Sequence, residues 1–325
     1  MKVLITGAAG FLGSAIVRQA VGAGLSVTAT DKFASAECNG VDFLVADILD
    51  TPGMSKAFRQ VDCVCHAAGL AHIFDKSAAL KAPFHTVNVV GSENVARLAA
   101  RAGVEHFVFI SSRSVYGGGA QGKDEDAACH PEEPYAASKL QAEERLIELC
   151  QKEGMNLTIL RLAPLYGPGD RGNVLRLIRS LDRGRFLWIG KGENLMSILH
   201  CEDAARACMA VIRSNLPGIN IFNVAAPACK MREIVTAISH SLGKSVPSWH
   251  IPASLALTSI KIIKLLLFNH SRIVTIHETL QKWLADNYYN TDKFLHTFNF
   301  QTKIRLEEGI NQEVAWYENQ TTVGS

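Results

Sequence analysis

Short apolar runs alternate with longer stretches of helical periodicity through the first half of the chain. The runs are rich in β-branched residues and lack the polar–apolar alternation of a strand with one wet face. Such strands, separated by helices, are typical of a parallel sheet that is covered on both faces. The pattern therefore predicts a doubly wound α/β sheet, with strands at residues 3–6, 26–30, 43–46, 63–67, 107–111 and 157–160.

After Pro164 the pattern loosens into glycine and proline turns. A chain of 325 residues is long enough for one large α/β domain and a smaller lobe. We expect a nucleotide-binding domain at residues 1–165 and a smaller C-terminal α/β substrate lobe at 166–325, interleaved in one compact unit. Helical periodicity in the second half is found at residues 173–183, 231–242 and 305–316.

The 33 basic and 31 acidic side chains are nearly balanced and interspersed. A nucleic-acid backbone requires a basic stripe, which this sequence lacks, so we expect no nucleic-acid partner. The eight cysteines form no C-x-x-C pair and lie mostly in apolar runs, which predicts reduced thiols and no metal site. The first strand begins almost at Met1, so we expect no cleavable signal and a cytoplasmic protein.

Residues 253–268 form the most apolar stretch of the second half. Lys261 and Lys264 interrupt it, and it is shorter than the roughly 20 residues that a membrane-spanning helix needs. Two interpretations stay open. The segment is either an amphipathic helix that covers the substrate lobe, or a peripheral contact with a membrane surface.

A glycine-rich turn lies directly between the first strand and the first helix. Gly7 permits the tight turn, Gly10 lets the backbone approach a pyrophosphate, and Gly13 allows the helix to pack closely on the strand. Phe11 and Leu12 begin the helix, whose N-terminal amides would bind the anion. This context predicts a Rossmann-type dinucleotide site.

Asp31 ends the second strand, where a carboxylate accepts hydrogen bonds from the adenosine ribose of the cofactor. The same carboxylate would repel the 2′-phosphate of NADP. The sequence therefore favours NAD, although Lys32 beside Asp31 would soften that repulsion.

Tyr135 and Lys139 are four residues apart, so on a helix they share one face. A neighbouring cation lowers the pKa of a phenol, so Tyr135 would exchange a proton with a substrate oxygen near neutral pH. Lys139 would also bind the nicotinamide ribose. The strand before this helix ends at Ser111 and Ser112, and Ser112 would hold the substrate oxygen at the carboxyl edge of the sheet.

These pieces, in this order, resemble the extended short-chain dehydrogenase/reductase family. The resemblance implies a catalytic Ser112, Tyr135 and Lys139, NAD as cofactor, and a homodimer formed through helices near residues 92–102 and 134–150. The segments that carry it are T-G-A-A-G-F-L-G at 6–13, Asp47-Ile48, His66-Ala67-Ala68, Ser111-Ser112 before Val115-Tyr116-Gly117, and Tyr135 with Lys139. It also implies a wider cofactor groove that contains Asp47, Ile48, Ala67, Ala68, Gly69, Asn88, Ser111 and Pro164.

The usual substrates of the family are nucleotide-linked sugars, which react through a 4-keto group. Three departures narrow the choice here. Arg113 and Ser114 replace an acidic pair of the dehydratases, Pro164 replaces an asparagine of the 4-epimerases, and Met196 replaces an arginine that grips the diphosphate. Substrate binding would then rest on other donors, for which the candidates are Arg113, Arg171, Asn173 and Arg176.

The sequence thus favours an NAD(H)-dependent nucleotide-sugar 4-epimerase or 4-keto-sugar reductase, with Tyr135 as the acid and base. Because similar apolar replacements occur in relatives that resemble 3β-hydroxysteroid dehydrogenases, an oxidoreductase acting on a hydrophobic alcohol is one alternative. A non-catalytic module that senses NAD is another.

Overall fold

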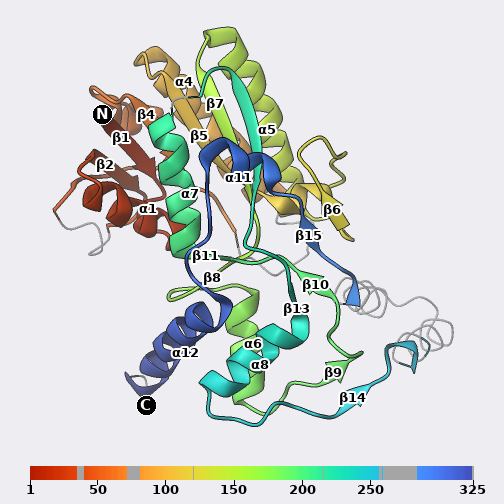
Figure 1. Ribbon diagram of the computed structural model, residues 1–325. Coiled ribbons are helices and arrows are strands. Elements are labelled where there is room, and N and C mark those ends of the chain that lie inside the picture. Colours follow the sequence, from red (N-terminus) through yellow and green to blue (C-terminus); the bar gives the residue numbers. More distant parts are fainter. Residues whose placement is uncertain are drawn as a thin grey trace.

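The computed structural model describes residues 1–34, 40–71, 81–119, 121–214, 216–255, 258 and 284–323. Its centre is a seven-stranded sheet in which every neighbouring pair is parallel (Figure 1). In spatial order the strands are β12 (Ile219–Val224), β7 (Asn156–Leu162), β5 (His106–Ser112), β4 (Cys63–His66), β1 (Lys2–Thr6), β2 (Ser26–Asp31) and β3 (Asp42–Val45). The predicted doubly wound sheet is confirmed.

The strand order reverses between β1 and β4. The chain runs outward from β1 through β2 and β3, then returns to the other side of β1 and continues outward from β4. In open parallel sheets, a ligand binds in the crevice at the carboxyl ends of the two strands where this reversal occurs. Gly7 follows β1 and Ala67 follows β4, so the glycine turn lies at this crevice.

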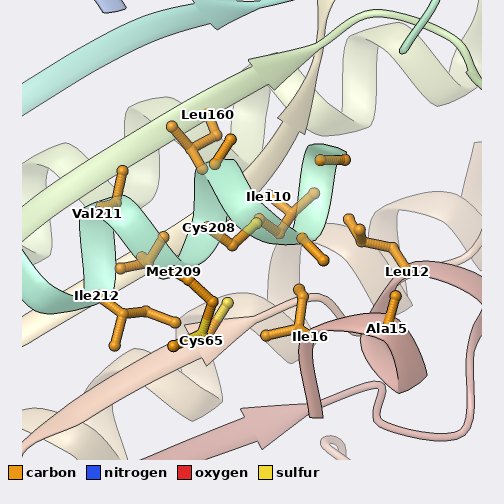
Figure 2. Packing of buried hydrophobic residues seen from close by; sticks show 14 of the residues in the cluster. Leu12, Ala15, Ile16, Cys65, Ile110, Leu160, Cys208, Met209, Val211 and Ile212 are labelled. Carbon is orange, nitrogen blue, oxygen red and sulfur yellow. The ribbon is translucent and has the colours of Figure 1, made fainter. Parts of the chain in front are cut away.

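Helices cover both faces of the sheet (Figure 1). On one face, α1 (Phe11–Gly22) and α7 (Cys201–Ser214) pack together, and Figure 2 shows Ile16 and Cys208 of these helices in one cluster with strand residues such as Cys65 and Leu160. On the other face lie α4 (Ser92–Arg101) and α5 (Pro134–Glu153). Burial of each large aliphatic side chain in these layers contributes about 2 kcal/mol to the free energy of unfolding.

The second half of the chain builds a lobe below the sheet and also returns to the sheet itself. The lobe has its own apolar core, to which three helices contribute. Figure 1 shows these helices below the sheet. These helices are α6 (Asn173–Asp182), α8 (Met231–Ser241) and α12 (Leu306–Val323). By contrast, α7, β12 and α11 (Asp292–Phe298) pack with the large sheet although they follow residue 165. The two units are therefore interleaved along the chain.

Short elements connect these layers. Those in the sheet domain are α2 (Thr51–Met54), η2 (Ser55–Phe58), α3 (Lys81–Phe84), the π-helix η4 (His85–Gly91), η5 (Arg113–Tyr116) and β6 (Gln121–Lys123), which pairs with β15 (Tyr288–Tyr289). The two-residue strands are β8 (Leu165–Tyr166), β9 (Trp188–Ile189), β10 (Leu195–Met196), β11 (Leu199–His200), β13 (Cys229–Lys230) and β14 (His250–Ile251).

The apolar segment at residues 253–268 falls almost entirely outside the described residues, so its two interpretations stay predictions. In the part of the chain that the structure describes, no helix combines the length and the apolar character needed to cross a bilayer.

Gly13 offers a test of the close packing between α1 and β1. A Cβ at this position would lie 1.9 Å from the Gly7 carbonyl oxygen, which is backbone and cannot move aside. We predict that Gly13→Ala lowers the free energy of unfolding by about 3 kcal/mol. Gly22→Ala, in the same helix, is the matched control, because a Cβ at that position meets nothing within 4 Å. This substitution should raise the free energy of unfolding by about 0.5–1 kcal/mol. Equal urea midpoints for the two variants would contradict this packing argument.

Candidate active site

The glycine turn brings three backbone segments into close contact. Gly7 has φ of 70°, and a Cβ there would lie 2.5 Å from the Ala68 amide nitrogen. Gly10 is the N-cap of α1, and no described side chain caps that helix or places an acid in its first turn. The first amides of α1 are thus available to an anion at the positive end of the helix dipole. This geometry fits the pyrophosphate of a dinucleotide.

Asp31 is tied to the glycine turn. Its carboxylate accepts the Ala9 N–H at 3.0 Å and the Lys32 N–H at 2.7 Å. The Lys32 ammonium is 3.0 Å from an Asp47 carboxylate oxygen instead. A hydrogen bond from the Leu49 amide, more than Lys32 itself, lowers the pKa of Asp47. Because the ammonium of Lys32 is paired with Asp47, it does not neutralise Asp31. The Asp31 carboxylate would therefore repel the 2′-phosphate of NADP.

The segment after β4 forms the facing wall of the groove. Ala67 donates its N–H to the Thr6 carbonyl at 3.2 Å, and Ala68 donates to the Thr6 hydroxyl at 3.3 Å. Below them, the two nitrogens of His66 contact Thr6 and Ser92 hydroxyls at 2.7 and 2.9 Å. Burial lowers the pKa of His66 to about 3, so the imidazole is a neutral structural group.

Asn88 connects the segment after β4 to α5. It lies buried on η4, accepts the Leu70 N–H at 2.7 Å and donates to the Leu70 carbonyl at 3.1 Å. Its amide also donates to the Ser138 hydroxyl of α5 at 2.9 Å. A Cβ on Gly69 would lie 3.2 Å from Asn88 Oδ1 and 3.6 Å from Lys139 Nζ. Gly69 therefore lies close to both Asn88 and Lys139.

Ser112 and Tyr135 meet through their hydroxyl groups. Ser112 ends β5, where its side chain accepts the Ser114 N–H at 3.2 Å, and it hydrogen-bonds the Tyr135 hydroxyl. Burial raises the pKa of Tyr135, and the bond to Ser112 offsets this only in part. The sequence predicted a phenol whose pKa is lowered by Lys139, and this part of the prediction was wrong. Desolvation outweighs the hydrogen bond, and Lys139 does not act on the phenol.

Lys139 is instead held beneath the sheet edge. Its ammonium donates to the Ile110 carbonyl at 2.7 Å and lies 4.5 Å from the centroid of the Phe109 ring. Burial lowers the pKa of Lys139 to about 8, and the Glu143 carboxylate opposes that shift. The side chain therefore gains or loses its charge close to physiological pH.

Glu143 lies one helical turn beyond Lys139 and is almost fully buried. It accepts a short hydrogen bond from the Ser111 hydroxyl, and its Oε2 is 2.7 Å from Nη2 of Arg161 on β7. Only 1% of the Glu143 side chain and 5% of the Arg161 side chain are exposed. Burial opposes the charge of Arg161, but Glu143 and Tyr116 together raise its pKa. Arg161 therefore keeps its positive charge inside the protein.

The same network extends to the edge strand β12. Arg161 Nη1 donates to the Tyr116 hydroxyl at 2.9 Å, and that hydroxyl donates to Asn223 Oδ1 at 2.8 Å. The sequence analysis missed these residues. Two signals were present: an arginine within the apolar run of β7, and a glutamate one turn after Lys139 on the same helix face.

The predicted substrate residues come from two separate elements. Arg171, Asn173 and Arg176 are exposed at the start of α6, whereas Arg113 is half-buried on η5. The positions that lack the usual donors lie on the lobe side: Met196 is half-buried on β10, and Pro164 presents a carbonyl that accepts the Leu199 N–H at 3.0 Å.

A buried acid supports the turn that leads into the lobe. Glu313 of α12 accepts the Gly167 N–H at 2.8 Å, and burial next to Asp170 raises the pKa of Glu313 to about 9. A Cβ on Gly169, two residues further along, would lie 3.3 Å from the Phe11 ring. The turn at Gly167–Gly169 therefore packs against Phe11, directly after the glycine turn. The Glu313 carboxyl group, which is protonated at neutral pH, supports this turn through its bond to Gly167.

The described cysteines are free, and five of them are buried. Among the residues with described positions, no three His, Cys, Asp or Glu side chains are grouped so that they could hold a metal ion.

Comparison with known proteins defines the class. The family model "NAD dependent epimerase/dehydratase family" matches residues 3–225. The chain belongs to this family, which confirms the resemblance to extended short-chain dehydrogenases/reductases, and it is an NAD-dependent enzyme. This assignment sets aside the alternative of a non-catalytic NAD sensor.

Individual relatives differ in their substrates. The chain is 27% identical to N-acetyl-alpha-D-glucosaminyl-diphospho-ditrans,octacis-undecaprenol 4-epimerase of Escherichia coli O157:H7, with 97% of this chain and 95% of that protein covered. It is 32% identical to a dTDP-glucose 4,6-dehydratase of Streptomyces griseus, with 74% and 78% covered. The crystal structure of a Thermus thermophilus UDP-glucose 4-epimerase in complex with NAD is similar with a TM-score of 0.76 and 26% identity, covering 98% and 99%.

Glu143→Gln tests the electrostatic link between the buried ion pair and Lys139. Loss of the negative charge should lower the pKa of Lys139 further, because Glu143 opposes the effect of burial. The ammonium is then lost at lower pH, so the alkaline limb of the pH profile of kcat/KM should move to lower pH. Exposed Glu144→Gln is the matched control. If the alkaline limb is unchanged in Glu143→Gln, the proposed effect of Glu143 on the pKa of Lys139 is refuted.

Glu313→Gln tests the protonated acid beneath the turn. The folded protein keeps this proton up to about pH 9, whereas the unfolded chain loses it near the ordinary value of 4.5. The stabilising contribution is therefore complete below the unfolded pKa and declines as pH rises towards the folded pKa, by up to about 1.4 kcal/mol per pH unit. Glu313→Gln should be more stable than the wild type at pH 8, and the difference should shrink at pH 5.

Urea unfolding at several pH values measures this difference. Glu308→Gln, exposed on the same helix, should keep the wild-type dependence on pH. Parallel stability curves for Glu313→Gln and the wild type would contradict the assignment of a protonated carboxyl group.

Proposed function

We propose that the protein acts at C4 of a nucleotide-linked sugar, as a 4-epimerase or as a reductase of a 4-keto sugar. The observation that supports this most directly is the hydrogen-bonded pair of Ser112 and Tyr135 at the carboxyl edge of the sheet, next to the glycine turn. Lys139 lies one turn further along the same helix. The relatives include 4-epimerases, which fits this arrangement.

The proposed roles follow from the positions of these groups. Ser112 holds the reacting oxygen by a hydrogen bond, and Tyr135 gives a proton to that oxygen or removes one from it. Because burial raises the pKa of Tyr135, its phenol is protonated at neutral pH and can act as the acid when a 4-keto group is reduced, with NADH as the hydride donor. In the oxidation that begins epimerisation, NAD would accept the hydride while the Tyr135 phenolate accepts the hydroxyl proton. Gly7, Gly10, Gly13, Asp31 and the segment that contains Ala67 and Ala68, together with Asn88, would hold the cofactor.

Elimination of water fits this site poorly, although dehydratases occur among the relatives. Elimination needs an acid and a base beside the sugar ring. Arg113 and Ser114 follow Ser112, and the Ser114 hydroxyl donates to the Ser112 hydroxyl at 2.9 Å. Neither side chain is a carboxylic acid that can transfer a proton.

A more hydrophobic substrate is the second candidate. Pro164 and Met196 offer no side-chain donor on the lobe side, and the Escherichia coli relative is named for a sugar carried on undecaprenol diphosphate. A free nucleotide then contributes little to binding. Screening UDP, dTDP, GDP and CDP sugars by melting temperature separates the two candidates, since a ligand of the native state raises the melting temperature.

We also propose a cytoplasmic homodimer. Its interface would be formed by α4 and α5, which lie side by side on one face of the sheet (Figure 1). The outer surfaces of these helices carry ion pairs such as Arg97–Glu93 and Arg145–Glu148, so the proposed interface is polar.

Tyr135→Phe should lower kcat by about 10²–10⁴-fold while binding of NAD is retained, because only the proton-transferring hydroxyl is lost. The assay uses protein loaded with NAD and the nucleotide sugar that raises the melting temperature most, with analysis of the sugar product. Tyr317→Phe is the control, since its hydroxyl contacts Asp182 in the lobe at 2.9 Å. Full activity of Tyr135→Phe would refute its role, and no turnover of any nucleotide sugar by the wild type would refute this substrate class.

A further inference from the structure

Arg113 differs from the other arginines that are removed from solvent. In the described part of the chain, only Arg113, Arg161 and Arg206 are not exposed. Arg161 forms an ion pair with Glu143 at 2.7 Å, and Arg206 forms one with Asp203 at 2.5 Å. No acidic side chain with a described position forms an ion pair with Arg113.

Neutral groups hold the Arg113 side chain on one side. Its Nη1 donates to Asn287 Oδ1 at 2.5 Å and to the Tyr289 hydroxyl at 2.7 Å, and the guanidinium lies 5.4 Å from the centroid of the Tyr289 ring. A guanidinium has five N–H donors in a fixed plane. Its Nε and Nη2 have no hydrogen-bond partner among the described residues, so several donors are available to a ligand.

Asn287 is a rigid support for this arginine. Its N–H donates to the Leu195 carbonyl at 2.7 Å, and its carbonyl accepts the Ser197 N–H at 3.0 Å. Asn287 is thereby paired with Met196, the lobe residue that lacks a donor. Arg113, which follows the end of β5, thus contacts Asn287 beside Met196 of β10 in the lobe.

Arg113 is the chain neighbour of a residue in the proposed reaction centre. It follows Ser112 directly, and Ser112 hydrogen-bonds Tyr135. A half-buried cation without a counterion loses much of its hydration, which a protein recovers when a ligand brings the opposite charge. The planar donors of arginine match a carboxylate or a phosphate.

We propose that Arg113 recognises an anionic oxygen group of the substrate, and that Asn287 and Tyr289 position it for this role. The inference rests on the proposed function, because the substrate is placed at Ser112 and Tyr135. Two parts of a nucleotide sugar carry such a group: the diphosphate, and a carboxylate on the sugar ring. If Arg113 binds the sugar carboxylate, it determines whether a charged or a neutral sugar is preferred. If it binds the diphosphate, it replaces the cation that is missing at Met196.

The test measures binding of UDP, UDP-glucose and UDP-glucuronic acid to the NAD-loaded wild type and to Arg113→Gln by calorimetry. Loss of charge-assisted hydrogen bonds should weaken binding by about tenfold or more. Equal weakening for all three ligands identifies the diphosphate as the group that Arg113 binds. Weakening for UDP-glucuronic acid alone identifies the sugar carboxylate.

Matched variants separate recognition from folding. Arg113→Lys keeps the charge but loses the planar donors, so its affinity should be intermediate. Arg59→Gln, exposed at the end of η2 and outside the proposed dimer interface, should bind like the wild type. Melting temperatures of all variants report on the fold. If Arg113→Gln binds all three ligands within about twofold of the wild type, the inference is overturned while the proposed function stands.

The opposite failure is also distinguishable. If none of the UDP, dTDP, GDP and CDP sugars of the screen binds the wild type, pyrophosphate and glucuronate are titrated instead. Binding of either anion that depends on Arg113 would then keep this inference and overturn the nucleotide-sugar function. Absence of such binding would overturn both.

Discussion

The geometry of the candidate active site depends on the ion pair between the buried carboxylate of Glu143 and Arg161. This carboxylate joins α5 to β5 through Ser111 and to β7 through Arg161, and the guanidinium extends the connection to Tyr116. Two charges in a low-dielectric interior lose their hydration, so such a pair persists only when each donor and acceptor is satisfied. Because the helix that bears Glu143 also bears Tyr135, the helix cannot slide or rotate on the sheet without breaking this pair. The meeting of Tyr135 with Ser112 is fixed in this way.

The two sides of the candidate site are built by different means. On the cofactor side, backbone atoms of the glycine turn and of the segment after β4 approach so closely that side chains are excluded. On the lobe side, polar side chains make the connecting hydrogen bonds. Glu313 accepts a hydrogen bond from the Gly167 amide, and Arg113 donates one to Asn287. A wall made of backbone suits a cofactor shared by a whole family. A wall made of side chains lets the substrate change while the fold stays the same.

Much of the sheet domain was predictable because its signals are local. Six strands are continuous apolar runs, and the glycine turn stands between a strand and a helix. The strand β12 was missed because Asn220 and Asn223 interrupt its apolar pattern and Pro217-Gly218 precedes it. The two-residue strands of the lobe have no periodicity to detect. Their pairing depends on tertiary contacts.

The candidate site was predictable in its residue types and less so in its electrostatics. Ser112, Tyr135 and Lys139 follow from spacing and strand position. The pKa of Tyr135 could not be inferred from the nearby lysine, because burial depends on packing by residues such as Phe84 that are distant in sequence. Arg161 and Glu143 belong to different elements, and only the folded chain shows that they form one pair.

The interleaving of the two units has a consequence for the order of synthesis. The apolar face of α1 is covered by α7, and the edge of β7 is covered by β12; both elements follow α6 but precede α8 and α12 in the chain. A nascent chain that ends at residue 165 still exposes that face of the sheet. The apolar core of the sheet therefore does not close before residue 224 has been synthesised, when two helices of the lobe are still to come.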